Sequence, residues 1–261
     1  PQINSASCTL FSQFQTYSNF NNTVLSFIIC YSIISIYYTG SAIKEDEQIL
    51  HRASIQGDIA VPINRNADPC VQTGCKWPKS SDGKVYIPYV IANSYTSQQL
   101  SVITTAINSF SASTCIRFFP RTTQTDYINI KCYSLVGRQG NVQTVSLKSE
   151  GCIYFGTVQH ELIHALGFNH EQCRSDRDQH IKILLQNVIP GEEYNFDKIN
   201  TLNQGTPYDY NSVMHYGRLA FSKDNVSPTM VAIPNSNAVF GTATQMSQND
   251  IDRINLLYCS K

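Results

Sequence analysis

The chain carries little charge, and neither sign of charge dominates. Acidic and basic residues number 19 each, and charged residues make up only 15% of the 261 residues. Because the two signs are interspersed and balanced, the sequence does not predict binding to nucleic acid or to an anionic membrane surface. A solenoid-type repeat and a low-complexity run are also missing, which argues against a repeat array.

Apolar runs long enough to span a membrane are missing too. The apolar stretch Val24–Tyr38 is too short for a spanning helix, and the small residues Thr39–Ala42 follow it. Segment 1–42 therefore resembles the apolar core and cleavage region of a signal peptide, which predicts a secreted chain. Two absences weigh against this interpretation, since no initiator Met precedes the stretch and no Lys or Arg occurs before Lys44. A truncated or wrongly predicted N-terminus and a buried strand are the alternatives.

Cysteine, by contrast, is plentiful. Nine cysteines indicate an oxidising compartment, in agreement with secretion. Spacing alone does not fix how they pair. Seven of them lie from residue 66 onward: Cys70, Cys75, Cys115, Cys132, Cys152, Cys173 and Cys259.

The most informative pattern is an eleven-residue segment that begins at His160. His160 and His164 are four residues apart, so on a helix they lie on one face, about one turn from each other. Two imidazoles so placed can bind one Zn²⁺, and Glu161 stands beside them to act on water at the metal. Gly167 can end the helix in a left-handed conformation, which lets the chain bring His170 round as a third ligand. Three neutral nitrogen ligands leave a position open for water, which predicts a catalytic zinc.

A buried amphipathic helix that happens to carry histidines is the simpler interpretation of this segment. A bare H-E-x-x-H pattern arises by chance, but a third histidine at the metzincin offset argues against chance here. Metzincins also have a Met-turn downstream, and Ser212–Tyr216 fits that place. Met214 alone would be an ordinary core side chain, and its value is that it occurs where the zinc motif predicts it.

These motifs resemble those of the astacin family of zinc metalloproteases. The resemblance extends from about Ile55 to Cys259, and further matches are similar to the fish hatching enzymes (choriolysins) and the nephrosin-type astacins. The matching segments are Glu171–Asp178 after the third histidine, Ser212–Tyr216, Cys70 and Cys75 before Trp77–Ser80, Cys115–Phe118, Pro120–Thr122 and Thr206–Tyr210.

The resemblance implies an α+β fold, the two-lobed catalytic domain of metzincins. In that fold a mixed sheet and the active-site helix form the N-terminal lobe, the C-terminal lobe is rich in loops, and one zinc ion lies in the cleft between them. The substrate would be a protein or peptide. The expected organisation is a signal-like or uncertain segment 1–42, a propeptide 43–65 and a protease domain 66–261. The protein is expected to act as a monomer and to bind neither nucleic acid nor, stably, a membrane. Release through secretory granules is one route of secretion.

The resemblance also implies a zymogen. The Gly-Asp pair that ends at Asp58 resembles the astacin propeptide motif, in which the carboxylate fills the open position on zinc, although Ile55 stands where that motif usually has Phe. An activating protease that cleaves near Arg65 would release Asp58 and free Asn66 as a new N-terminus. In the family this amino group is buried near the Glu after the third histidine, here Glu171. The alternatives are a simple turn at Asp58 and a surface carboxylate at Glu171.

Two catalytic roles follow for residues of the zinc segment and the Met-turn. Glu161 is expected to act as general base and to pass the proton to the leaving amine. Tyr216 resembles the astacin tyrosine that ligates zinc at rest and then hydrogen-bonds the developing oxyanion. A packed surface aromatic is the alternative for Tyr216. His51, His180 and His215 are expected to be structural, since the ligand set is complete without them.

The family's disulfides carry over to three pairs. The resemblance implies Cys115 with Cys259, Cys132 with Cys152 and Cys70 with Cys75. Cys173 is left over, and since three histidines suffice for the zinc, we interpret it as an unpaired thiol rather than a ligand.

Periodicity predicts where the main elements lie. Apolar residues at helical spacing predict a helix over Thr96–Phe110 with Ser97 as its cap. Ser247 and Asp250 have capping-box-like spacing before a predicted helix near Asn249–Tyr258. The metal helix is expected over Gly156–Leu166. β-branched and aromatic content predicts four strands, at Val85–Ile91, Cys115–Phe119, Tyr127–Ile130 and Thr144–Leu147.

One departure from the hatching-type astacins bears on the biological role. The segment Asp126–Tyr133 is more compact than in hatching-type astacins, which affects the cleft rim and so the substrate preference. A glycosylation sequon at Asn225 is weakened by Pro228. Egg-envelope proteolysis, as in hatching enzymes, is the leading prediction. A nephrosin-like, immune or digestive secreted protease and a non-catalytic secreted binding protein are the alternatives.

Overall fold

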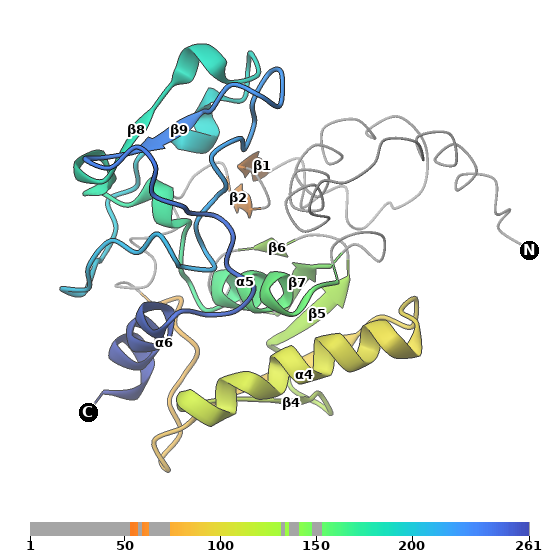
Figure 1. The fold of residues 1–261 in the computed structure, drawn as a ribbon. Coiled ribbons are helices and arrows are strands. Elements are labelled where there is room, and N and C mark those ends of the chain that lie inside the picture. The colour runs from red at the N-terminus through yellow and green to blue at the C-terminus, as the bar shows by residue number, and fades with distance from the viewer. Residues whose placement is uncertain are drawn as a thin grey trace, which may run out of the picture.

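The N-terminal lobe is built on a parallel four-stranded sheet. The computed structural model describes residues 53–56, 59–62, 74–131, 134–135, 141–147 and 153–260. All three pairings in the sheet are parallel, and its strand order is β4-β3-β5-β7 (Figure 1). The strands are β3 (Val85–Ile91), β4 (Ile116–Pro120), β5 (Tyr127–Lys131) and β7 (Val142–Ser146).

Two long helices complete this lobe. Helix α4 (Ser97–Ser113) contacts β4 and α5 (Phe155–Ala165), and α5 also contacts β7. The predicted cap of α4 was wrong by one residue, because Ser97 is the first helical residue and Thr96 is the N-cap. The Thr96 hydroxyl accepts from the Gln99 backbone N–H (3.3 Å), while the Gln99 side chain accepts from the Thr96 N–H (2.8 Å).

A smaller three-stranded sheet lies next to the metal helix. Strand β1 (Ala53–Gln56) pairs antiparallel with β2 (Ile59–Pro62), and β2 pairs parallel with β6 (Ser134–Leu135). This mixed sheet reaches α5 through β6, which contacts the helix (Figure 1). Part of the predicted propeptide therefore lies one strand away from the element that carries the predicted zinc ligands.

The C-terminal lobe has little regular structure, as predicted. Short helical turns alternate with loops, and one antiparallel pair joins β8 (Ile181–Ile183) to β9 (Met230–Ala232). Its own apolar cluster includes Phe196, Tyr216 and Met230, separate from the larger cluster of the N-terminal lobe. The turns are η1 (Glu171–Cys173), η2 (Arg177–Gln179), η3 (Leu185–Asn187) and η4 (Glu193–Phe196).

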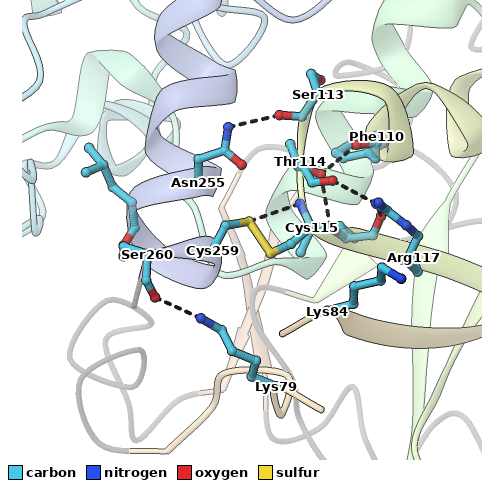
Figure 2. The surroundings of a disulfide bond; sticks show 12 residues. Lys79, Lys84, Phe110, Ser113, Thr114, Cys115, Arg117, Asn255, Cys259 and Ser260 are labelled. Atoms are coloured by element: carbon cyan, nitrogen blue, oxygen red, sulfur yellow. Dashed lines mark hydrogen bonds between the residues drawn. A yellow bond between two sulfur atoms is a disulfide. The ribbon is translucent and has the colours of Figure 1, made fainter. Parts of the chain in front are cut away.

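The end of the chain returns to the N-terminal lobe. Helix α6 (Gln248–Ile254) continues into the π-helical turn η5 (Asn255–Cys259), and its start has the predicted capping box of Ser247 and Asp250. Figure 2 shows the disulfide between Cys259 and Cys115, the pair that the family resemblance implies. The disulfide and the nearby hydrogen bonds fix α6 against the first lobe.

Element types agree with the sequence predictions, while several bounds shift by one or two residues. The strand predicted at Cys115–Phe119 is Ile116–Pro120, and the one predicted at Thr144–Leu147 is Val142–Ser146. Among the described residues, no helix is both long and apolar enough to cross a membrane. The predictions for Val24–Tyr38, His51, Asp58, Arg65, Asn66, Cys70, Cys132 and Cys152 lie outside the described residues.

Candidate metal centre

Helix α5 and the turn after it bring three histidines together. Every residue of α5 from Gly156 to Ala165 is buried, which includes His160 and His164. Gly167 follows the helix with φ +98°, a left-handed conformation that favours glycine, and the chain reverses there. His170 then lies beside the other two and is 3% exposed.

The three imidazoles converge through their Nε2 atoms. Nε2 of His164 lies 3.0 Å from Nε2 of His160 and 3.1 Å from Nε2 of His170. Two backbone carbonyls set the tautomers, because Nδ1 of His160 donates to the Val213 carbonyl and Nδ1 of His164 to the Phe168 carbonyl, each at 2.7 Å. The Nε2 lone pairs of these rings are therefore left facing a common point.

This donor set fits zinc. Ligand atoms of the three histidines lie within 4.8 Å of one another, and they are the one such group found among the described residues. Buried lone pairs aimed at one another repel unless a cation lies between them, and neutral imidazole nitrogen is a preferred zinc ligand. Glu161 follows His160 on the same helix and is buried, with 5% exposure.

The predicted Met-turn contacts His170 and the two residues that follow it. The backbone N–H of Glu171 donates to the Met214 carbonyl (2.9 Å), and the Tyr216 N–H donates to Oε1 of Gln172 (3.0 Å). The Tyr216 ring packs against the His170 ring, with centroids 4.2 Å apart. Met214 belongs to the first apolar cluster and Tyr216 to the second, so the histidines lie where the two cores meet.

Glu171 is buried in a network of charges, so the surface alternative for this carboxylate was wrong. Its Oε1 accepts from the Asp209 backbone N–H (2.7 Å) and from Nη2 of Arg253 (2.9 Å), and its Oε2 accepts from Nη1 of Arg253 (2.5 Å). Burial raises the pKa of the Glu171 carboxyl, and the guanidinium groups of Arg253 and Arg174 oppose that shift. A cavity of about 40 Å³ adjoins this network and is also lined by Leu202.

A second carboxylate, Asp250, supports the backbone that holds His160. Its Oδ1 accepts from the Ser212 hydroxyl (2.6 Å), and its Oδ2 accepts from the Val213 N–H (2.9 Å). Because the carbonyl of Val213 in turn accepts from His160, Asp250 stands one residue removed from a zinc-binding ring.

The two other histidines among the described residues, His180 and His215, have structural environments. His215 is buried, its Nε2 lies 2.7 Å from the Tyr208 hydroxyl, and its Nδ1 lies 2.8 Å from the Tyr216 carbonyl. Burial lowers the pKa of His215 to about 4, so the ring is neutral at physiological pH. The His180 ring stacks on Tyr208, and both histidines lie outside the three-histidine group. The expectation that they are structural agrees with these contacts.

Cys173 is buried away from the three-histidine group. Its thiol donates to the Asn195 carbonyl at 3.6 Å, which suits a packed side chain better than a metal ligand.

Three supporting residues were not identified from the sequence. Arg253 lies in a polar segment without a recognisable motif, Gln172 lies in a segment that resembles the family but was given no role, and Asp250 was identified only as a helix cap. Each acts through a partner that is distant in sequence, such as Glu171 at a separation of 82 residues from Arg253. Of the three, only Asp250 had been given a structural role from the sequence, through its capping-box spacing with Ser247.

The chain is similar to known proteins over most of its length. The model of the peptidase family described as Astacin matches residues 72–259. The chain is 48% identical over 212 residues to high choriolytic enzyme 1 of Oryzias latipes, covering 78% of this chain and 77% of that protein. It is 47% identical over 210 residues to the low choriolytic enzyme of the same fish, with 78% and 77% covered. The solved structure of high choriolytic enzyme 1, a hatching enzyme zinc-protease from medaka, matches with a TM-score of 0.72 and 47% identity, covering 75% of this chain and 100% of that one.

Proposed function

The chain belongs to the astacin family of zinc metalloendopeptidases, and from this premise we propose that it is a secreted protease, made as a zymogen, that cleaves egg-envelope proteins. The observation that carries the enzymatic part is the convergence of three buried Nε2 atoms, with Tyr216 packed against His170 and Glu161 buried on the helix that carries two of the histidines. Similarity to two choriolytic enzymes favours the egg envelope over other substrates.

The proposed roles divide between binding the metal and handling the proton. His160, His164 and His170 would hold the ion, which when bound polarises the scissile carbonyl and lowers the pKa of water. Glu161 would accept the proton of the attacking water and deliver it to the leaving amine, and its burial strengthens its interactions with nearby charge. Tyr216, held against His170, would donate a hydrogen bond to the oxyanion.

The zymogen part of the proposal rests on strand β2 and on Glu171. β1 ends at Gln56 and β2 begins at Ile59, so Asp58 falls between two strands whose sheet reaches α5 through β6. We propose that Asp58 blocks the metal until cleavage after Arg65. The new amino group of Asn66 would then enter the cavity beside Glu171, with the protease domain starting at that residue.

One pair of variants tests the chemistry. The full chain is produced, cleaved after Arg65 and incubated with a peptide library, with and without a zinc chelator. The parent should cleave peptides only when the metal is present. Glu161→Gln should keep stoichiometric zinc and lose hydrolysis, whereas Glu193→Gln, which changes an exposed side chain in η4, should match the parent. Full activity in Glu161→Gln would refute the role of Glu161 as base. Zinc binding without any hydrolysis by the parent would favour a non-catalytic binding protein.

A second experiment separates the two biological roles. The activated chain is incubated with isolated fish egg envelopes and, at equal concentration, with casein. A hatching protease should release soluble envelope fragments at a rate comparable to or above that for casein. Hydrolysis of casein alone would favour the nephrosin-like or digestive alternative and overturn the egg-envelope assignment while leaving the chemistry intact.

A further inference from the structure

A short segment between β9 and α6 contacts both the Met-turn and the metal helix α5. Residues 240–246 follow the hairpin strand of the C-terminal lobe and run past α5 before α6 begins (Figure 1). At one end Phe240 packs on the ring of His215, with centroids 4.8 Å apart. At the other end the Met246 N–H donates to Oε1 of Gln159 on α5 (2.8 Å).

The first close approach is at Gly241. This residue has φ +68°, a left-handed conformation that an L side chain rarely adopts. A Cβ placed on it would come within 2.6 Å of the carbonyl carbon of Tyr216 and closer still to the backbone of Gly217. The segment therefore lies directly on the peptide bond that follows the proposed catalytic tyrosine, with no room for even a methyl group.

The second close approach is at the beginning of the metal helix. A Cβ on Gly156 would lie 2.6 Å from the carbonyl carbon and oxygen of Thr244 and 3.2 Å from the backbone nitrogen of Gln245. Gly156 precedes His160 by one helical turn. Thr244 thus contacts α5, and Gly241, three residues earlier in the segment, contacts the peptide bond after Tyr216. The segment joins these two parts of the protein.

We propose that Gly241 is a positioning residue for Tyr216. The segment 240–246 is held on α5 at Gly156 and Gln159, and Gly241 sets how closely the Tyr216 backbone approaches that helix. Tyr216 is restrained on its other side, because its N–H donates to Gln172 and its ring packs against His170. A methyl group at position 241 would therefore move the peptide that carries the Tyr216 ring relative to the histidines.

The inference rests on the proposed function of Tyr216, and its kinetic signature follows from that role. A hydrogen bond made only in the transition state contributes to kcat and leaves substrate binding unchanged. Loss of one oxyanion donor lowers kcat by about 100-fold to 1,000-fold. Displacing Tyr216 should thus lower kcat with KM nearly unchanged. The same displacement should change kcat little in a Tyr216→Phe variant, which lacks the Tyr216 hydroxyl.

The test compares two glycines with nearly equal backbone angles. Gly205 has φ +70° and nothing within 4 Å of an added Cβ, so Gly205→Ala carries the same backbone strain without the clash. Both alanine variants are made in the full chain, which is then cleaved after Arg65, in the parent and in the Tyr216→Phe background. Hydrogen exchange of the peptide spanning Met214–Ala220 is measured on the metal-free protein as a readout that does not depend on catalysis.

The expected result has three parts. Gly241→Ala lowers kcat by about ten-fold or more with KM within about two-fold of the parent, Gly205→Ala does neither, and Gly241→Ala changes kcat little in the Tyr216→Phe background. The Met214–Ala220 peptide exchanges faster in Gly241→Ala only. If Gly241→Ala does not fold, Phe240→Leu, which loosens the segment without adding atoms, should give a smaller loss of kcat that also disappears in the Tyr216→Phe background.

Two outcomes would overturn the inference, and one would overturn its premise. An undiminished loss of kcat from Gly241→Ala in the Tyr216→Phe background, or an equal loss in Gly205→Ala, would show a general structural effect. If Tyr216→Phe itself retains the parent kcat, the proposed function of Tyr216 fails instead, which is a distinguishable result.

Discussion

Arg253 of α6 donates to both carboxylate oxygens of Glu171, the residue that directly follows the third histidine. The two side chains are 9% and 2% exposed. The same helix supplies Asp250, which holds the backbone partner of His160. Helix α6 therefore supports two of the three proposed zinc ligands.

The first prediction concerns this buried ion pair. Arg253→Met should lower the free energy of unfolding by about 3–5 kcal/mol, because it leaves the Glu171 carboxylate buried with Arg174 as its remaining, more distant guanidinium at 3.5 Å. Urea unfolding of the full chain measures the change. Lys198→Ala breaks an exposed pair with Asp178 and should cost no more than about 1 kcal/mol. Adding Glu171→Gln to Arg253→Met should recover part of the loss, and equal losses in the Arg253 and Lys198 variants would contradict the prediction.

The second prediction concerns Asp250 and metal affinity. Asp250→Ala removes the acceptor of the Val213 N–H, so the carbonyl that orients His160 is less well fixed, and zinc affinity should fall by about ten-fold. Competition with a chromogenic chelator measures the affinity. Asp252→Ala, on the same helix, removes only a hydrogen bond with Gln248 and is the matched control. An unchanged zinc affinity in Asp250→Ala would remove this residue from the support of the metal site.

The zinc ligands could be predicted from sequence because their geometry is local. His160 and His164 are related by one helical turn, and Gly167 is the residue type that ends a helix in the observed left-handed conformation. Apolar residues at helical spacing likewise predicted α4. Its cap was missed by one residue because Thr96 and Ser97 are both good caps, and the reciprocal bond with Gln99 decides between them.

The support around the ligands could not be predicted, because it depends on tertiary contacts. Arg253 lies in a polar heptapeptide that is also typical of a solvated helix, and only the fold brings it to Glu171. Gly241 looks like an ordinary loop glycine until the structure places the Tyr216 peptide against it. Predicting such contacts requires the positions of two segments at once, which local spacing does not contain.

The third prediction concerns the disulfide that fixes the end of the chain. Cys115 and Cys259 are 144 residues apart, and closing so long a loop contributes about 4–5 kcal/mol in the chain-entropy model. Replacing both by Ser should lower the free energy of unfolding by about that amount, measured in urea. The loosened α6 should also exchange its amide hydrogens faster. The amide hydrogens of α4 should still exchange only through global unfolding. A double variant with parental stability would show that noncovalent contacts suffice, such as the bond from Tyr258 to the Leu166 carbonyl.

The fourth prediction concerns removal of the metal. Zinc binds the folded arrangement of three Nε2 atoms, which the unfolded chain lacks, so it should stabilise the fold by about 2.7 kcal/mol when free zinc is about 100 times the dissociation constant. A chelator should therefore lower the melting temperature of the parent, and added zinc should restore it. His164→Ala removes the ring whose Nε2 lies within 3.1 Å of both others, so its melting temperature should respond little to either treatment. His180→Ala, whose ring stacks on Tyr208 away from the group, should keep the full response even if its baseline falls. A response to chelator that is equal in His164→Ala and the parent would mean that the stabilising metal binds elsewhere.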